Sequence, residues 1–242
     1  MKKHIPNTIT CCNLISGCVA TVFALYGVPE MALLFIILGA VFDFFDGMTA
    51  RVLGVSSPIG KELDSLADDV TFGVAPASIM FWFLGVIDYP SFLEGLRGII
   101  PFFAFIISAF SALRLAKFNL DTRQTTSFIG LPTPANALFW GSLVVGFETQ
   151  MTYSLYSLPL LIIGIVISSW LLVAEIPMFA LKFKHWGFKG NEIKYGFVIF
   201  SAIALISGIA YGIIEDNIKF YYAPFCIIIV AYIAVSIATQ KK

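Results

Sequence analysis

Charge and cysteine are both scarce in this sequence. Asp, Glu, Lys and Arg make up 12% of its 242 residues, whereas a soluble domain carries about 25%. The formal net charge is zero, so the chain lacks the basic surface with which proteins neutralise nucleic-acid phosphates. The four cysteines show no metal-ligand or redox spacing. These absences argue against a soluble domain, a nucleic-acid partner and a thiol-based metal site.

Long apolar runs fill the chain instead. Apolar residues make up 59% of the sequence, and the mean hydropathy is +0.90. A helix needs about 20 mostly apolar residues to cross a bilayer, and turn or charge signals divide the chain into eight such stretches. The sequence therefore predicts an all-α, polytopic transmembrane helix bundle of about eight spans, at residues 8–26, 30–52, 62–86, 97–118, 132–149, 155–181, 194–214 and 220–239.

The basic residues orient these predicted spans. Cytoplasmic loops of membrane proteins are rich in Lys and Arg. With the N-terminus in the cytoplasm, thirteen basic residues fall on the cytoplasmic side, and Arg97 and Lys219 fall on the other. One miscounted helix would invert every later loop, so this asymmetry predicts that both termini are cytoplasmic. The thirteen residues are Lys2, Lys3, Arg51, Lys61, Arg114, Lys117, Arg123, Lys182, Lys184, Lys189, Lys194, Lys241 and Lys242.

Acidic residues gather where the second predicted span ends and the third begins. Residues spaced by three or four positions share a helical face. One face of each span carries this pattern: Asp43, Asp46, Gly47, Ala50 and Arg51 on the second, and Gly60, Asp64 and Asp68 on the third. The turn over residues 52–60 would fold the two faces together at the cytoplasmic surface. Glu62 and Asp69 lie off this common face, which predicts a solvated or supporting role for both.

Four carboxylates in a partly dehydrated site repel one another unless cations lie between them. Mg²⁺ and Mn²⁺ prefer oxygen ligands, and two ions about 3.5–4 Å apart are common in phosphoryl chemistry. Arg51 offers a planar donor fork for a phosphate. One alternative is a polar helix end in which the acids pair with Arg51 and Lys61. Another is a divalent-cation transporter, which would place its carboxylates near the bilayer midplane.

The eight residues of the two faces resemble the signature of the CDP-alcohol phosphatidyltransferases at every position and spacing. The resemblance implies one membrane-embedded domain over 1–242, with a catalytic core at about 1–150 and additional transmembrane helices over 151–242. It implies two Mg²⁺ or Mn²⁺ ions held by Asp43, Asp46, Asp64 and Asp68, with Asp68 as the general base. The CDP-lipid would bind along Asn7, Thr10, Asp46, Gly47, Ala50, Arg51, Gly60 and Lys61. A homodimer in the cell membrane, with its active site facing the cytoplasm, is expected.

Further stretches resemble the branch of this family whose acceptor is serine. They are PNTITCCNLISG, LDSLADDVTFGVAPA, RLAKFN and FIGLPTPANA. The implied reaction is attack by the L-serine hydroxyl on the lipid-bearing phosphate of CDP-diacylglycerol, which gives phosphatidylserine and CMP. The serine carboxylate needs a cation, and Arg114 and Lys117, followed by Asn119, are the predicted acceptor-binding residues. Glycerol-3-phosphate and inositol are alternative acceptors, although a phosphorylated acceptor needs a denser basic pocket.

Overall fold

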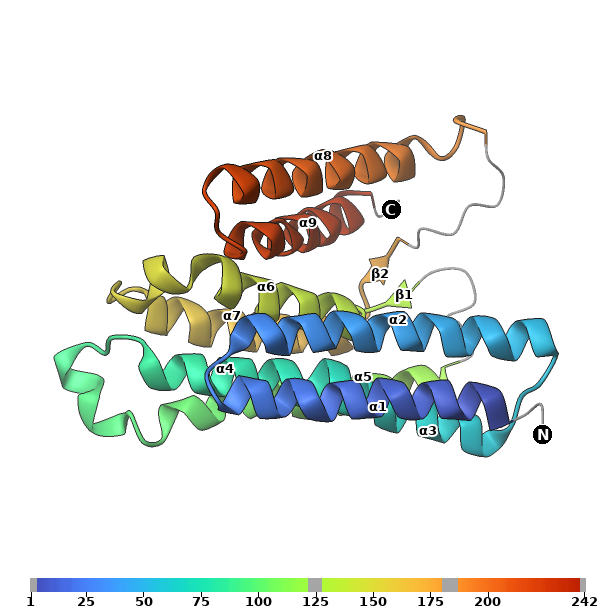
Figure 1. Ribbon diagram of the computed structural model, residues 1–242, viewed down its shortest axis with the longest axis horizontal. Helices are drawn as coiled ribbons and strands as arrows, with labels where there is room; N and C mark the ends of the chain where they lie inside the picture. Colours follow the sequence, from blue (N-terminus) through green and yellow to red (C-terminus); the bar gives the residue numbers. More distant parts are fainter. Residues whose placement is uncertain (1–3, 122–127, 180–186, 240–242) are drawn as a thin grey trace.

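The computed structural model describes residues 4–121, 128–179 and 187–239. Nearly all of them are helical (Figure 1). The elements are α1 (His4–Leu25), α2 (Pro29–Leu53), α3 (Pro58–Asp68), the π-helical turn η1 (Asp69–Val74), α4 (Ala75–Val86), the 3-10 turns η2 (Ser91–Leu96) and η3 (Ile100–Phe105), α5 (Ile106–Leu120), β1 (Phe128–Ile129), α6 (Thr133–Thr152), α7 (Ser157–Val173), β2 (Pro177–Met178), α8 (Glu192–Ile214) and α9 (Lys219–Ala238).

Six helical stretches in the described residues are long and apolar enough to cross a membrane. One of them is a continuous run over Pro58–Val86, in which α3, η1 and α4 follow one another without a break. The prediction of an all-helical polytopic membrane bundle is confirmed. The predicted span 155–181 is shorter in the structure, because the backbone becomes extended at Ala174 and passes into β2 at Pro177. Proline has no backbone N–H with which to continue a helix.

A tight turn brings the acidic ends of α2 and α3 together. Gly54 ends α2 with a φ of 62°, a left-handed conformation that glycine adopts without a steric penalty. Ser57 then caps α3, because its side-chain oxygen accepts a hydrogen bond of 3.0 Å from the Gly60 N–H. Pro58 occupies the first turn of α3, where no N–H is required. The chain therefore reverses over only a few residues, and α3 returns beside the end of α2.

The interior is packed most tightly around α4 and α6. Phe72, Phe83 and Trp140 are the largest of its fully buried side chains. The Trp140 Nε1 donates a hydrogen bond of 3.0 Å to Ser168 Oγ on α7, so the indole N–H is satisfied inside the bundle. The strands β1 and β2 pair in an antiparallel manner. This pairing joins the segment before α6 to the segment after α7. This packing fixes the helices that surround the acidic residues.

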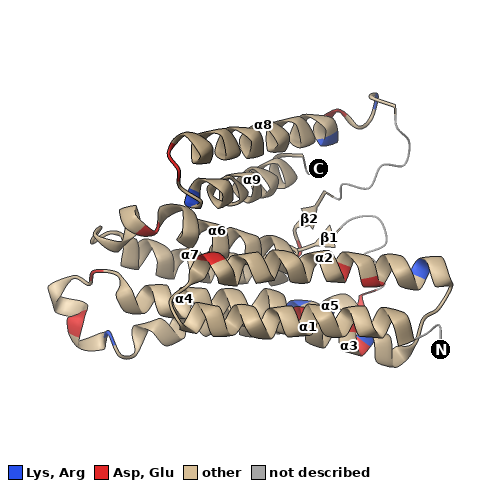
Figure 2. Cartoon of the chain, in the orientation of Figure 1, with Lys and Arg blue, Asp and Glu red and all other residues tan. Residues whose placement is uncertain are grey.

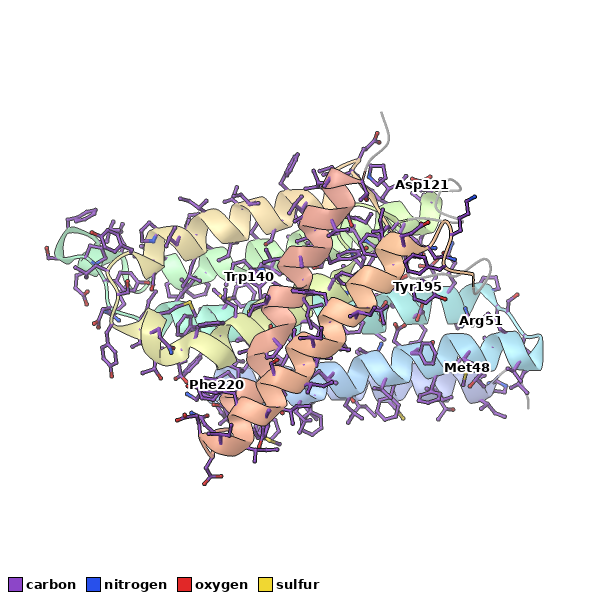
Figure 3. All side chains as sticks on the ribbon, turned by 90° about the horizontal axis from the view of Figure 1, so that it is seen from above. Met48, Arg51, Asp121, Trp140, Tyr195 and Phe220 are labelled. Atoms are coloured by element: carbon purple, nitrogen blue, oxygen red, sulfur yellow. The ribbon has the colours of Figure 1, made fainter. Side chains whose placement is uncertain are left out.

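The last two helices form a hairpin that crosses the bundle at an angle (Figure 3). α9 packs against α6, and α8 packs mainly against α9. α8 buries only Phe197 and Gly212, and the remaining apolar surface suits contact with lipid. At the start of α9, the Lys219 Nζ lies 2.5 Å from Glu148 Oε2 and 3.9 Å from Glu30 Oε1. This ion-pair group ties the hairpin to α6 and α2.

The two basic residues that were predicted to lie outside the cytoplasm fall at one end of the bundle. The loop over 87–99 and the turn between α8 and α9 lie at the end opposite the N-terminus (Figure 1), and they carry Arg97 and Lys219. Six of the thirteen residues predicted to be cytoplasmic fall in the described part: Arg51, Lys61, Arg114, Lys117, Lys189 and Lys194. The remainder lie outside the described residues, namely Lys2, Lys3, Arg123, Lys182, Lys184, Lys241 and Lys242.

Candidate active site

Three aspartates from α2 and α3 converge between the helices. Asp43, Asp64 and Asp68 each offer a carboxylate oxygen, and these oxygens lie within 4.8 Å of one another. All three side chains are half-buried, and the end of α2 and the start of α3 lie at the same end of the bundle as the N-terminus (Figure 2). Asp46 lies one turn beyond Asp43 and is 6% exposed. Asp46 is not one of the three aspartates whose oxygens converge, but it lies next to them.

The donor set fits divalent metal ions. Buried oxygens of Asp46 and Asp64 have no hydrogen-bond partner, and an uncompensated buried carboxylate is costly. Within the described residues no ion pair joins any of the four aspartates to Arg51 or Lys61. The Lys61 Nζ instead donates a hydrogen bond of 2.8 Å to the Asn119 carbonyl. The alternative in which the aspartates pair with Arg51 and Lys61 at a polar helix end is therefore not formed. Hard divalent cations are the natural counter-charge for these carboxylates.

Asp68 is held by a residue of α1. The Asn13 Nδ2 donates a hydrogen bond of 3.0 Å to Asp68 Oδ1, and Asn13 is completely buried. The Thr71 hydroxyl donates a bond of 3.0 Å to the Asn13 carbonyl. The three-residue spacing of Asn7, Thr10 and Asn13 predicts one polar face that binds a ligand or hydrogen-bonds another helix. For Asn13 the structure shows a hydrogen bond to another helix.

Close approach of α1 and α2 requires small residues at this point. A Cβ on Gly39 would lie 2.9 Å from Asn13 Oδ1 and 2.5 Å from Thr71 Cγ2. A Cβ on Gly17 would lie 2.4 Å from Thr71 Oγ1. All three distances are shorter than real Cβ contacts allow, so glycine at the two positions lets α1, α2 and η1 meet. Asp68 consequently has one oxygen fixed by Asn13 and one available for a ligand or a proton.

A cavity of about 240 Å³ opens beside the aspartates, between α1, α2 and α3. Seven of the eight residues predicted to bind the CDP-lipid line it: Asn7, Thr10, Asp46, Gly47, Ala50, Gly60 and Lys61. No atom lies within 4 Å of the position that a Cβ on Gly47 would take, so this glycine faces open space. Arg51 is exposed on the last turns of α2 (Figure 3) and does not line the cavity.

A second cavity, of about 300 Å³, lies between the end of α5 and the end of α7. Arg114 and Lys117 line it, together with Asp121 and Glu175. The Arg114 side chain is buried, and its guanidinium carbon lies 4.9 Å from the centre of the Phe118 ring. The buried guanidinium group therefore forms part of the wall of the second cavity.

The third predicted acceptor residue, Asn119, has a different environment. Its side-chain Nδ2 donates a hydrogen bond of 2.7 Å to Ser65 Oγ, and its carbonyl accepts the bond from Lys61. Asn119 does not line the second cavity. Through these contacts Asn119 links α3 to α5. Its side chain is directed toward Ser65 and not into the second cavity.

Glu62 and Asp69 differ in their exposure to solvent in the structure. Glu62 is exposed, as expected for a solvated acid. Asp69 is half-buried at the start of η1, and its Oδ1 is buried without a hydrogen-bond partner. Of the two predicted roles for Asp69, the solvated one is excluded, because η1 turns this side chain toward α5, and the supporting one stays a prediction.

Comparison with known proteins agrees with this geometry. The family model described as CDP-alcohol phosphatidyltransferase matches residues 3–181. Three similar proteins are each named CDP-diacylglycerol–serine O-phosphatidyltransferase. The one from Bacillus subtilis is 39% identical over 185 residues, 76% of this chain and 92% of that protein. The one from Methanocaldococcus jannaschii is 36% identical over 166 residues, 68% of this chain and 71% of that protein. The one from Helicobacter pylori strain J99 is 36% identical over 135 residues, 55% of this chain and 54% of that protein.

Proposed function

Since the chain belongs to the CDP-alcohol phosphatidyltransferase family, we propose that it transfers the phosphatidyl group of CDP-diacylglycerol to the hydroxyl of L-serine. The serine oxygen forms a bond to the lipid-bearing phosphorus, the bond from that phosphorus to CMP breaks, and the hydroxyl proton leaves to a base. The products are phosphatidylserine and CMP. The observation that carries the proposal is the convergence of Asp43, Asp64 and Asp68 beside the 240 Å³ cavity.

The four aspartates would hold two divalent ions. When bound, such ions stabilise the negative charge that develops on phosphate oxygens. Asp43, Asp46 and Asp64 act chiefly as ligands, while Asp68 also takes the proton of the acceptor hydroxyl. Asn13 supports this role because it fixes one oxygen of Asp68. A base held in one orientation loses less entropy when it meets the hydroxyl.

The donor nucleotide would bind in the cavity between α1, α2 and α3. Gly47 and Ala50 present little side-chain bulk there, so a diphosphate can approach the helix closely. Asn7, Thr10 and Lys61 supply polar contacts, and Gly60 lies where α3 begins. Arg51 would join the site by turning its side chain from solvent toward the diphosphate.

The acceptor would bind from the second cavity. Arg114 and Lys117 line this cavity and would offer positive charge for the serine carboxylate. Asn119 maintains the α3–α5 bridge beside them. The proposed setting is the cell membrane. The Lys and Arg distribution supports sites that face the cytoplasm, and the homodimer is proposed from the family resemblance alone.

Acceptor choice is tested with the full chain purified in detergent. We expect CMP release from CDP-diacylglycerol with L-serine in the presence of Mn²⁺ or Mg²⁺, and labelled serine should enter the lipid fraction. Glycerol-3-phosphate and inositol should support little release. A chelator should abolish the reaction, and readdition of either metal should identify the preferred ion. Release with glycerol-3-phosphate or inositol, but none with serine, would overturn the serine assignment.

A further inference from the structure

The helix that carries Asp68 changes geometry immediately after it. η1 begins at Asp69 and runs as a π-helix to Val74. Short π-helical turns are rare and often occur at functional sites. η1 contacts both α5 and α6, and α5 and α6 also contact each other. Three elements therefore enclose one small region on the side of η1 that faces α5.

Buried polar atoms without hydrogen-bond partners gather on these three elements. Ser111 and Asn136 are completely buried, and Thr133 is 1% exposed. Most buried polar groups in proteins are paired, and an unpaired one costs about 1–3 kcal/mol. The unpartnered atoms are Asp69 Oδ1, Ser111 Oγ, Arg114 Nε, Thr133 Oγ1 and both amide atoms of Asn136. Such a concentration beside a catalytic centre indicates a binding site for a small polar molecule.

Asp69 and Ser111 meet across Gly73. A Cβ on Gly73 would lie 2.8 Å from Asp69 Oδ1 and 3.1 Å from the Ser111 Cβ. The carboxylate and the serine thus face one another over a residue that has no side chain. Arg114 follows Ser111 by one turn of α5 and is buried as well. The residues with unpartnered atoms therefore include an acidic side chain, Asp69, and a basic side chain, Arg114.

We propose that Asp69 binds the ammonium group of the acceptor amino acid, with Ser111 and Asn136 as hydrogen-bonding neighbours, while Arg114 binds its carboxylate. The proposal rests on the function proposed above. A carboxylate within a membrane span needs a cation near it, and an amino acid supplies that cation together with a carboxylate for Arg114.

The test is Asp69→Asn in the full chain, assayed for CMP release. Loss of a charge-assisted hydrogen bond should raise the KM for L-serine by about 10- to 100-fold. The KM for CDP-diacylglycerol and the Mn²⁺ concentration for half-maximal rate should stay within about twofold. The variant should also lose its preference for L-serine over 3-hydroxypropanoate, which is serine without the amino group.

Glu62→Gln is the matched control, because Glu62 is an exposed acid on the same helical run, and its kinetics should be unchanged. Ser111→Ala should raise the KM for L-serine by a smaller factor. Thermal stabilisation offers a second readout: CDP-diacylglycerol should still stabilise Asp69→Asn, whereas L-serine should stabilise only the unmodified chain.

An unchanged KM for L-serine in Asp69→Asn would overturn the inference, and so would a shift confined to the Mn²⁺ requirement. These outcomes differ from failure of the proposed function itself. That failure would appear as no CMP release with serine in the unmodified chain.

Discussion

The hydrogen bond from Asn13 to Asp68 couples α1 to the proposed base. It spans 55 positions in the sequence, so spacing within one helix could not reveal it. The aspartate signature, by contrast, is local: its members repeat every three or four residues and were predictable from the sequence. Helix periodicity thus predicts which site residues share a face, whereas the contacts between faces of distant helices depend on packing that the sequence does not show.

Asp68→Asn tests the base. The amide cannot accept the hydroxyl proton, so kcat should fall by about 10²- to 10⁴-fold. Thermal stabilisation by CDP-diacylglycerol should persist, because the 240 Å³ cavity remains intact. Full activity in this variant would remove Asp68 from the role of base.

Asn13→Leu tests the positioning of that base. The substitution keeps a similar volume but removes the donor to Asp68, and kcat should fall about tenfold. Both KM values should change little, since Asn13 does not line either cavity. Thr8→Ala is the control, because Thr8 is an exposed residue of α1. A rise in KM for CDP-diacylglycerol without a change in kcat would contradict the positioning role.

Gly47→Ala separates stability from activity. Alanine in a helix interior is favoured over glycine by about 0.5–1 kcal/mol, and nothing lies near enough to clash. The free energy of unfolding should therefore rise, while the added methyl group in the donor cavity should lower kcat/KM at least about tenfold. Gly85→Ala in α4 has equal room and should leave activity unchanged. Equal activity in the two variants would show that the donor does not approach Gly47.

At the level of elements, most helix boundaries followed from the sequence. Gly54 and the Ser57–Pro58 pair marked the α2–α3 turn, and most apolar runs matched the helices within a few residues, although the run 155–181 extends beyond the end of α7 at Val173. η1 was not predicted. Pro76 lacks the N–H that would bond to the Phe72 carbonyl in a regular helix, and packing of Gly73 against Ser111 then decides how the helix adjusts. The β1–β2 pair likewise depends on a contact between distant segments.

The α8–α9 hairpin is closed by small residues of α8. A Cβ on Gly208 would lie 2.3 Å from Pro224 Cγ and 2.7 Å from the Phe220 carbonyl oxygen. Gly208→Leu should therefore force the helices apart and lower the midpoint of thermal unfolding. Overpacking of this kind costs about 1–3 kcal/mol.

The matched control is Gly196→Ala, since a Cβ there meets no atom within 4 Å, and it should leave the midpoint unchanged or raise it. Specific activity below the transition should be preserved in Gly208→Leu, if the catalytic core lies in about residues 1–150 as proposed. An unchanged melting curve for Gly208→Leu would show that the hairpin is not closed at this point.

For the whole molecule, the position of the hairpin is set at both ends of α9. Lys219 pairs with Glu148 at one end. Near the other end, the Tyr232 hydroxyl donates a bond of 3.0 Å to the Phe179 carbonyl. The hairpin begins after the last residue matched by the family model, so it is an extension packed on α6. Composition alone identified these helices as apolar spans but could not say which face of the bundle they cover.

The two cavities described above lie between different helices, one between α1, α2 and α3 and the other between α5 and α7. In the proposed function the lipid donor and the water-soluble acceptor therefore have separate entrances, and neither has to leave before the other binds. Such an arrangement predicts a ternary complex and a single displacement. Double-reciprocal plots should intersect rather than run parallel, and a chiral phosphorus should be inverted in the product. Parallel plots, or retention at phosphorus, would instead require a covalent phosphatidyl-enzyme intermediate.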